Sequence, residues 1–142
     1  MKSKIRYCEG YKYQLVESYI VEISIKPVAD IITTFIKLNR DGMLAIMAGY
    51  AWDGPSGPAF DTSSFMRGSL IHDALYQLIR LNKLPKKYKE VADLLLKEIC
   101  LEDGMWKFRA WYVHRAVKRL GIFSCRPGSE KEARVYSAPE DQ

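Results

Sequence analysis

The sequence lacks a long hydrophobic run and is poor in cysteine. No stretch of its 142 residues approaches the roughly 20 apolar residues that a membrane-spanning helix needs. Residues 1–10 do not contain the apolar stretch of a signal peptide. The three cysteines are odd in number and widely spaced, which favours neither a disulfide framework nor a zinc motif: Cys8, Cys100 and Cys125. We therefore expect no transmembrane segment, no signal peptide, and a cytoplasmic protein in which Cys100 is a core residue.

The composition is typical of one globular domain with a real core, because 48% of the residues are hydrophobic and 27% are charged. The net charge of +5 tolerates anionic partners without requiring them. Lysine and arginine gather in two stretches, at 83–89 and 107–119. Each stretch is either a solvated helix face or part of a basic rim that attracts phosphates.

The first third of the chain is rich in β-branched and aromatic residues, and Val21, Ile23 and Ile25 alternate with polar residues in the period of a strand. Asn39–Gly42 has the composition of a tight turn in which Gly42 takes a positive φ. The pattern predicts a small antiparallel meander, with strands over 11–16, 19–25, 31–38 and 43–48.

Helical periodicity begins after residue 63. Residues 50–58 contain two glycines and two prolines within five positions, which predicts an irregular loop there. Apolar residues then recur with a helical period in three segments. We expect an α+β fold, with helices over 64–82, from about 85 to 104 and over 105–120. Residues 1–126 are predicted to form a single domain, followed by a mobile tail over 127–142.

The first predicted helix carries the strongest candidate site. His72 and Tyr76 are four residues apart and therefore share a helix face. A neutral His72 could act as general base toward water if Asp93, on the next predicted helix, fixed its tautomer. The pattern therefore indicates a catalytic set of His72, Asp93 and Tyr76. The alternatives are a hydrogen-bonded core histidine, a tyrosine that only packs, and an exposed ladder in which Asp93 pairs with Lys89 and Lys97.

Asp73 and the loop before the helix are candidates for binding a cation and a substrate. Carboxylates of Asp73 and Asp53, with carbonyl oxygens of the loop, would suit a hard divalent cation such as calcium or magnesium. Backbone N–H groups of the same loop could hold a phosphate or an oxyanion. The alternatives are that Asp73 pairs with a basic side chain and that the loop is only a rigid turn. The candidate substrate-binding residues are Gly54, Ser56, Gly57 and Arg67.

Four motifs resemble a domain-of-unknown-function family that is common in tailed phages and prophages. They are an Asp-Gly-x-Ser-x-Pro loop, His-Asp-x-Leu-Tyr, an Ala-Asp pair and a helix end, at Asp53–Pro58, His72–Tyr76, Ala92–Asp93 and Val117–Gly121. The resemblance covers residues 40–121, and Gly57 stands where many members have another residue. It implies a phage protein that acts in the cytoplasm of the host, without naming an activity.

The chain is also similar, more distantly, to phospholipases A2. Those enzymes have a glycine-rich calcium loop, then His-Asp-x-x-Tyr on a helix, then an aspartate on the facing helix. The resemblance implies that His72 is the base, that Asp93 orients it, and that Asp73 binds calcium with the loop around Asp53. The chain departs from those enzymes because they are secreted and disulfide-bonded, and it has no matching cysteines.

Together these observations predict a small phage-type hydrolase that acts on a phosphate-containing substrate, with His72 as general base. The substrate is either a phospholipid or a nucleotide, including a cyclic oligonucleotide that signals host defence. The alternative is a non-catalytic phage protein, which either sequesters such a nucleotide or serves as a virion or assembly component. We expect an anionic small molecule or a lipid as partner and no sequence-specific nucleic acid. A homo-oligomer is left open.

Overall fold

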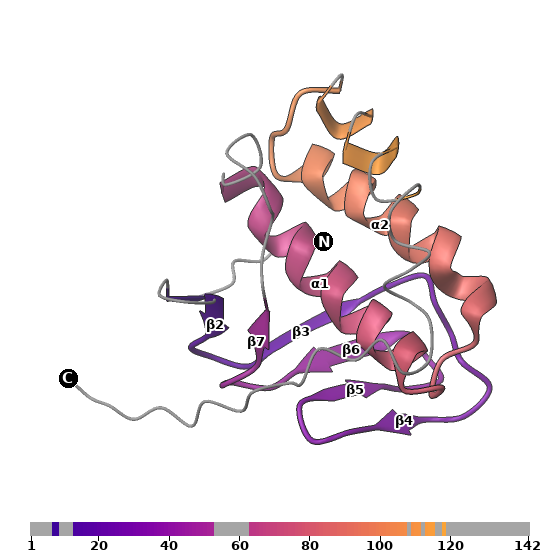
Figure 1. Ribbon diagram of the computed structural model, residues 1–142. Helices are drawn as coiled ribbons and strands as arrows, with labels where there is room; N and C mark the ends of the chain where they lie inside the picture. The colour runs from indigo at the N-terminus through magenta and orange to yellow at the C-terminus, as the bar shows by residue number, and fades with distance from the viewer. Residues whose placement is uncertain are drawn as a thin grey trace. The chain divides into compact units, whose positions relative to one another are not determined.

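The computed structural model describes residues 7–8, 13–52, 63–107, 109–111, 113–115 and 118. Antiparallel strands come first and three helices follow, which confirms the predicted α+β class (Figure 1). The described residues fall into two units, a strand unit over 7–52 and a helical unit over 63–118. The single domain over 1–126 stays a prediction, and the predicted tail over 127–142 lies outside the described residues.

The strand unit contains a four-stranded sheet with the order β3-β6-β5-β4, in which all neighbours are antiparallel. Side chains of β3 alternate as the sequence predicts, since Tyr19 and Val21 are buried while Ile20 and Glu22 are exposed. The predicted meander is present: β4, β5 and β6 pair in chain order, and β3 pairs with β6. Its strands are β3 (Tyr19–Glu22), β4 (Ile31–Ile32), β5 (Ile36–Leu38) and β6 (Met43–Ile46).

The turn between β5 and β6 is the one that the sequence predicts. The Asn39 side chain accepts hydrogen bonds from the backbone N–H groups of Asp41 and Met43, both at 2.9 Å. Gly42 has a φ of +88°, and a Cβ atom there would lie 2.5 Å from the carbonyl oxygen of Ile23. Glycine is required at this position both for its backbone conformation and for the close approach.

The predicted strand over 31–38 is wrong in one respect, because it is two strands joined by a turn. The backbone N–H of Thr33 donates to the carbonyl of Ile36 at 2.8 Å, and the Thr33 hydroxyl accepts from the N–H of Ile36 at 2.9 Å. A threonine side chain thus supplies the turn chemistry that glycine or proline usually provides. The run of β-branched residues conceals this turn.

A second sheet has three strands in the order β1-β2-β7. Its last strand, β7, lies in the segment that we predicted to be irregular from residue 50 onward, so the prediction is wrong for these two residues. Tyr13 pairs with Trp52 and Gln14 pairs with Ala51 in the antiparallel register. β7 is an edge strand of this sheet, and it is joined to β2 by these two residue pairs alone. The strands are β1 (Tyr7–Cys8), β2 (Tyr13–Leu15) and β7 (Ala51–Trp52).

The helical unit begins with α1 (Ser63–Arg80), continues through a 3-10 turn, η1 (Lys86–Tyr88), and α2 (Lys89–Glu102), and has a third helix at residues 107, 109–111, 113–115 and 118. Both long helices end in the same way. Asn82 and Gly104 adopt positive φ values of 59° and 98°. The next residue in each case donates its N–H back to the helix, at 2.9 Å. This is the Schellman arrangement, which satisfies the last carbonyl groups.

α1 and α2 pack closely where α1 has a glycine. A Cβ atom on Gly68 would lie 2.9 Å from Leu96 Cδ1 and 3.1 Å from Cys100 Sγ. Cys100 is fully buried, as predicted, and burial raises its pKa to about 12. The thiol is therefore part of the packing between helices. The buried cluster around it joins all three helices through Phe65, Leu96, Cys100, Met105, Ala110 and Val113.

Candidate functional site

The candidate site lies between α1 and α2, where two side chains from sequence-distant positions meet. His72 Nε2 lies 2.8 Å from Asp93 Oδ1. The Asp93 side chain is 1% exposed and that of His72 is 10% exposed. The predicted contact between these two residues is confirmed, while their catalytic role stays a prediction. α1 places His72 on the face that carries its apolar stripe, and α2 presents Asp93 from its buried face beside Ala92.

Asp93 accepts hydrogen bonds from two further donors. The Tyr76 hydroxyl donates to Oδ1 at 2.5 Å, and Lys89 Nζ donates to Oδ2 at 2.9 Å. Burial alone would raise the pKa of Asp93, but the bonds from His72, Tyr76 and Lys89 together hold it below its usual value. The carboxylate is therefore ionised at neutral pH although it is buried.

The charge on Asp93 fixes the tautomer of the histidine. An ionised carboxylate only accepts hydrogen bonds, so a neutral His72 must carry its proton on Nε2. Nδ1 then holds the lone pair, and it makes no hydrogen bond within the described residues. The His72 ring packs against the Tyr76 ring, with 4.0 Å between centroids. The arrangement can accept a proton from a water molecule at Nδ1 and stabilise the imidazolium that results.

Lys89 is the member of this network that the sequence analysis missed. Its spacing of four residues from Asp93 suggested an exposed ladder, but the Lys89 side chain is only 11% exposed. Its ammonium group also donates to the carbonyl oxygen of Lys118 on the third helix, at 3.3 Å. Lys89 thus connects Asp93 to a third element. The i,i+4 spacing was the available signal, and only the three-dimensional packing shows that the pair is buried.

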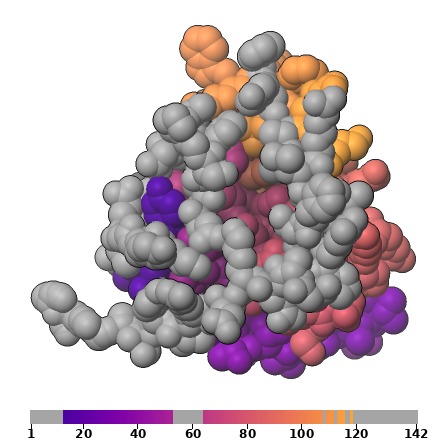
Figure 2. Space-filling model, viewed as in Figure 1, coloured from indigo at the N-terminus to yellow at the C-terminus, as the bar shows by residue number. Residues whose placement is uncertain are grey.

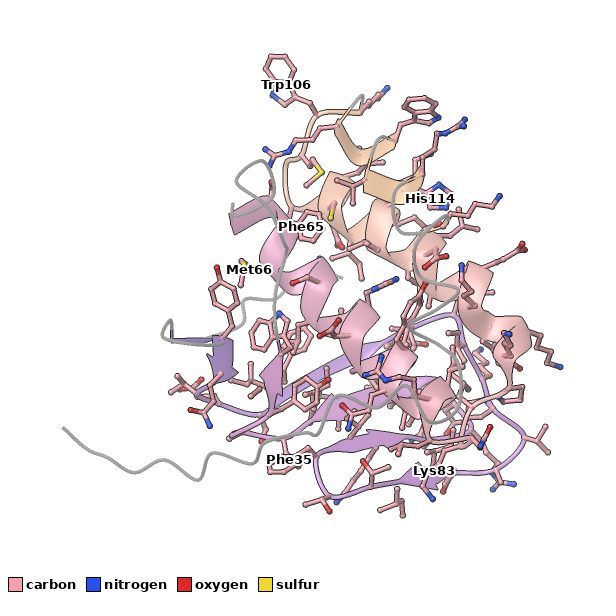
Figure 3. All side chains as sticks on the ribbon, viewed as in Figure 1. Phe35, Phe65, Met66, Lys83, Trp106 and His114 are labelled. Atoms are coloured by element: carbon pink, nitrogen blue, oxygen red, sulfur yellow. The ribbon has the colours of Figure 1, made fainter. Side chains whose placement is uncertain are left out.

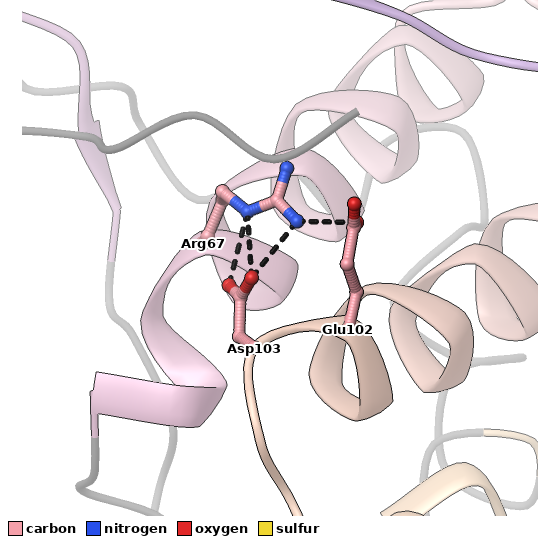
Figure 4. Close-up of polar contacts among 3 residues, drawn as sticks. All are labelled: Arg67, Glu102 and Asp103. Carbon is pink, nitrogen blue, oxygen red and sulfur yellow. Dashed lines mark hydrogen bonds and ion pairs between the residues drawn. The ribbon is translucent and has the colours of Figure 1, made fainter.

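Arg67 lies one and a half turns before His72 on α1, and two acidic side chains hold it (Figure 4). Nε and Nη2 bond both carboxylate oxygens of Asp103, the shortest contacts being 2.9 Å, and Nη2 lies 2.6 Å from Glu102 Oε2. Burial would raise the pKa of Glu102, but the hydrogen bond and charge of Arg67 lower it. The substrate-binding role of Arg67 stays a prediction, and the contacts describe an ion pair between α1 and the end of α2.

The remaining predicted site residues are only partly described. Asp73 is half-buried and follows His72 directly on α1. The predicted loop residues Asp53, Gly54, Ser56 and Gly57 lie outside the described residues. Within the part of the chain that the structure describes, no three His, Cys, Asp or Glu side chains gather as a metal site would require. The structure thus brings His72, Asp93 and Tyr76 together.

No family model, curated protein or solved structure matches the chain. The resemblances to the phage family and to phospholipases A2 therefore stay predictions. In the described residues, no helix combines the length and the apolar character needed to cross a bilayer. A functional conclusion for this chain has to be argued from the chemistry of the site itself.

Proposed function

We propose that the chain is a hydrolase of a phosphate-containing substrate in which His72 is the general base. The observation that carries the proposal is the hydrogen bond from His72 Nε2 to the buried, ionised carboxylate of Asp93. Because Nε2 of His72 is bonded to this carboxylate, Nδ1 is the basic nitrogen before any substrate binds. In the reaction, Nδ1 takes a proton from a water molecule as the water oxygen forms its bond to the substrate, and the imidazolium later returns the proton to the leaving group.

Asp93 and Tyr76 act by positioning the base. Asp93 stabilises the imidazolium through charge, and the Tyr76 hydroxyl fixes the carboxylate through its bond to the same oxygen atom. This arrangement is also what the similarity to phospholipases A2 implies for His72 and Asp93. Placing an ionised carboxylate at 1% exposure requires several donors to offset the lost hydration, as Asp93 has here. These hydrogen bonds to Asp93 are better explained by a functional site than by the packing of the two helices alone.

The cation that this similarity implies fits the described residues only in part. Asp73 offers a half-buried carboxylate next to the base, which is the ligand type that calcium and magnesium prefer. Asp53 and the loop carbonyls would have to complete the site. A bound cation would supply charge stabilisation to a developing oxyanion. The proposal for His72 stands without it.

The test is to incubate the purified chain with mixed phospholipids and with linear and cyclic nucleotides, in calcium, in magnesium and in chelator. We expect one substrate to be consumed, and we expect His72→Ala to slow its hydrolysis by about 100-fold or more. The chain has two histidines, so His114→Ala is the matched control and should retain most of the rate. Asp73→Asn should remove any dependence on the cation.

Other outcomes would favour the non-catalytic alternatives. Recovery of every compound intact, with one nucleotide held equally by the wild type and His72→Ala, would favour a protein that sequesters a signal. Recovery of every compound intact and unbound would favour a virion or assembly component. The phage origin derives from the family resemblance, and both it and the action in the host cytoplasm belong to this proposal.

A further inference from the structure

The third helix and the residue before it expose an unusual set of side chains. Trp106 is 83% exposed and Trp111 is 45% exposed, although tryptophan is normally well buried. In Figure 3 the Trp106 side chain extends away from the ribbon, and in Figure 2 the orange atoms of this stretch lie at the surface. Two indole rings held toward solvent on one short element need an explanation.

Three basic residues of the third helix lie on the same face as Trp111. Lys107 and Arg115 are each four residues from Trp111, and Lys118 is seven residues beyond it, so all four share one face of the helix. All of them are exposed, whereas Ala110 and Val113 on the opposite face are buried. From Met105 to Leu120 the sequence has no acidic residue and five basic ones: Lys107, Arg109, Arg115, Lys118 and Arg119. The face therefore carries charge of one sign.

We propose that this Trp–basic face, formed by Trp106, Lys107, Trp111, Arg115 and Lys118, docks onto an anionic phospholipid surface. Indole rings prefer the headgroup region of a bilayer, where one edge is apolar and the other can donate a hydrogen bond. Lysine and arginine extend their charged groups to anionic headgroups while their stems lie on apolar surface. A helix with this composition lies in the membrane interface without spanning the bilayer.

The geometry of Trp111 favours lipid over a nucleic acid. The Arg115 guanidinium lies 5.2 Å from the centre of the Trp111 ring. It lies over one of the two faces of the indole, which reduces the ring surface on which a single-stranded base could stack. Insertion of a ring edge among headgroups leaves this cation–π contact in place. The face lies within the helical unit, and the docking does not require His72 or any catalytic step.

The test is sedimentation of the full chain with vesicles of phosphatidylcholine alone or mixed with phosphatidylglycerol. We expect the wild type to bind the phosphatidylglycerol vesicles and to lose binding as salt is added. Because Trp52 is 2% exposed, a blue shift of tryptophan fluorescence on binding would report Trp106 and Trp111. Replacing Lys107, Arg115 and Lys118 by glutamine should weaken binding on the order of fivefold per residue. Trp106→Ala with Trp111→Ala should weaken binding and abolish the shift.

The matched control removes two exposed apolar residues of the strand unit, Val28 and Ile32, which are 93% and 67% exposed. Val28→Ala with Ile32→Ala should bind vesicles like the wild type, and urea unfolding should confirm that every variant is folded. Equal vesicle binding by the double-tryptophan variant would overturn the proposal. Binding of a single-stranded oligonucleotide without any binding to phosphatidylglycerol vesicles would overturn it in favour of a nucleic-acid partner. His72→Ala should bind vesicles fully, so this test is separate from that of the hydrolase.

Discussion

Two polar clusters connect α1 to α2, and they differ in what each leaves available for chemistry. In the Arg67 cluster, a guanidinium meets the carboxylates of Glu102 and Asp103. In the His72 cluster, one carboxylate meets an imidazole, a phenol and an ammonium group. A guanidinium does not give up its proton in proteins, so the first cluster can only hold charge. An imidazole exchanges protons near neutral pH, so the second cluster can carry a reaction.

The comparison shows why burial of charge does not by itself mark an active site. Arg67 has a side chain that is only 4% exposed, less than the 10% of His72. The described contacts of Arg67 are ion pairs between opposite charges. In His72, by contrast, the bond from Nε2 to Asp93 leaves Nδ1 as the nitrogen that carries the lone pair. A proton-accepting atom beside a fully bonded carboxylate is the feature that separates the two clusters.

The largest expected effect comes from breaking the Arg67 cluster. Arg67→Met would leave Asp103, which is 13% exposed, without its cation, so we expect a loss of about 3–5 kcal/mol of unfolding free energy. Urea unfolding followed by circular dichroism measures this loss. The matched control is Lys83→Met, an exposed cation whose loss should cost no more than about 0.5 kcal/mol. If Arg67→Met kept its stability and lost activity, Arg67 would return to the substrate-binding role predicted from sequence.

A smaller effect is expected from removing one donor of the His72 cluster. Tyr76→Phe deletes the hydroxyl that bonds Asp93 and keeps the ring that packs on His72. Hydrogen bonds to charged groups contribute about 1.5–3 kcal/mol, and we expect a loss of that size in urea unfolding. Tyr88→Phe is the matched control, since the Tyr88 hydroxyl makes no hydrogen bond within the described residues. Equal stability of Tyr76→Phe and wild type would mean that His72 and Lys89 alone hold the carboxylate.

Local patterns predict those parts of the molecule that local interactions determine. The alternation in β3, the Asn39–Gly42 turn and the end of α2 at Gly104 follow from short-range rules, and the structure agrees with them. The turn inside residues 31–38 was missed because Thr33 replaces the usual turn residues. The pairing of β7 was missed because two residues are too few to show a period.

The candidate site divides in the same way. The shared face of His72 and Tyr76 follows from helix geometry, and a partner on the next helix is a reasonable expectation once both helices are predicted. The burial of Lys89 and its bond to the Lys118 carbonyl depend on how three helices pack. No spacing rule contains that information, because an i,i+4 pair looks the same in sequence whether water or a third helix covers it.

The last prediction uses pH to test whether Asp93 is charged in the folded protein. Its pKa lies below the ordinary value of 3.8 because His72, Tyr76 and Lys89 outweigh the burial that would raise it. A carboxyl group whose pKa is lower in the folded state stabilises the fold above its unfolded pKa, and this stabilisation is lost as pH falls through the folded pKa. Asp93→Asn removes the titrating group, so its unfolding free energy should be lower than that of the wild type at neutral pH.

The stability curves of wild type and Asp93→Asn, measured by urea unfolding from about pH 6 to about pH 2, should therefore converge in acid. Asp41→Asn replaces an exposed carboxylate of the β5–β6 turn and should follow the wild-type curve. Parallel curves for wild type and Asp93→Asn would mean that the pKa of Asp93 is the same in the folded and unfolded states, against the lowered pKa. If the wild type instead lost stability relative to Asp93→Asn as the pH rose above about 4, Asp93 would be neutral when folded. In that case Nε2 of His72 would not have to carry the proton, and the assignment of Nδ1 as the base would fail with it.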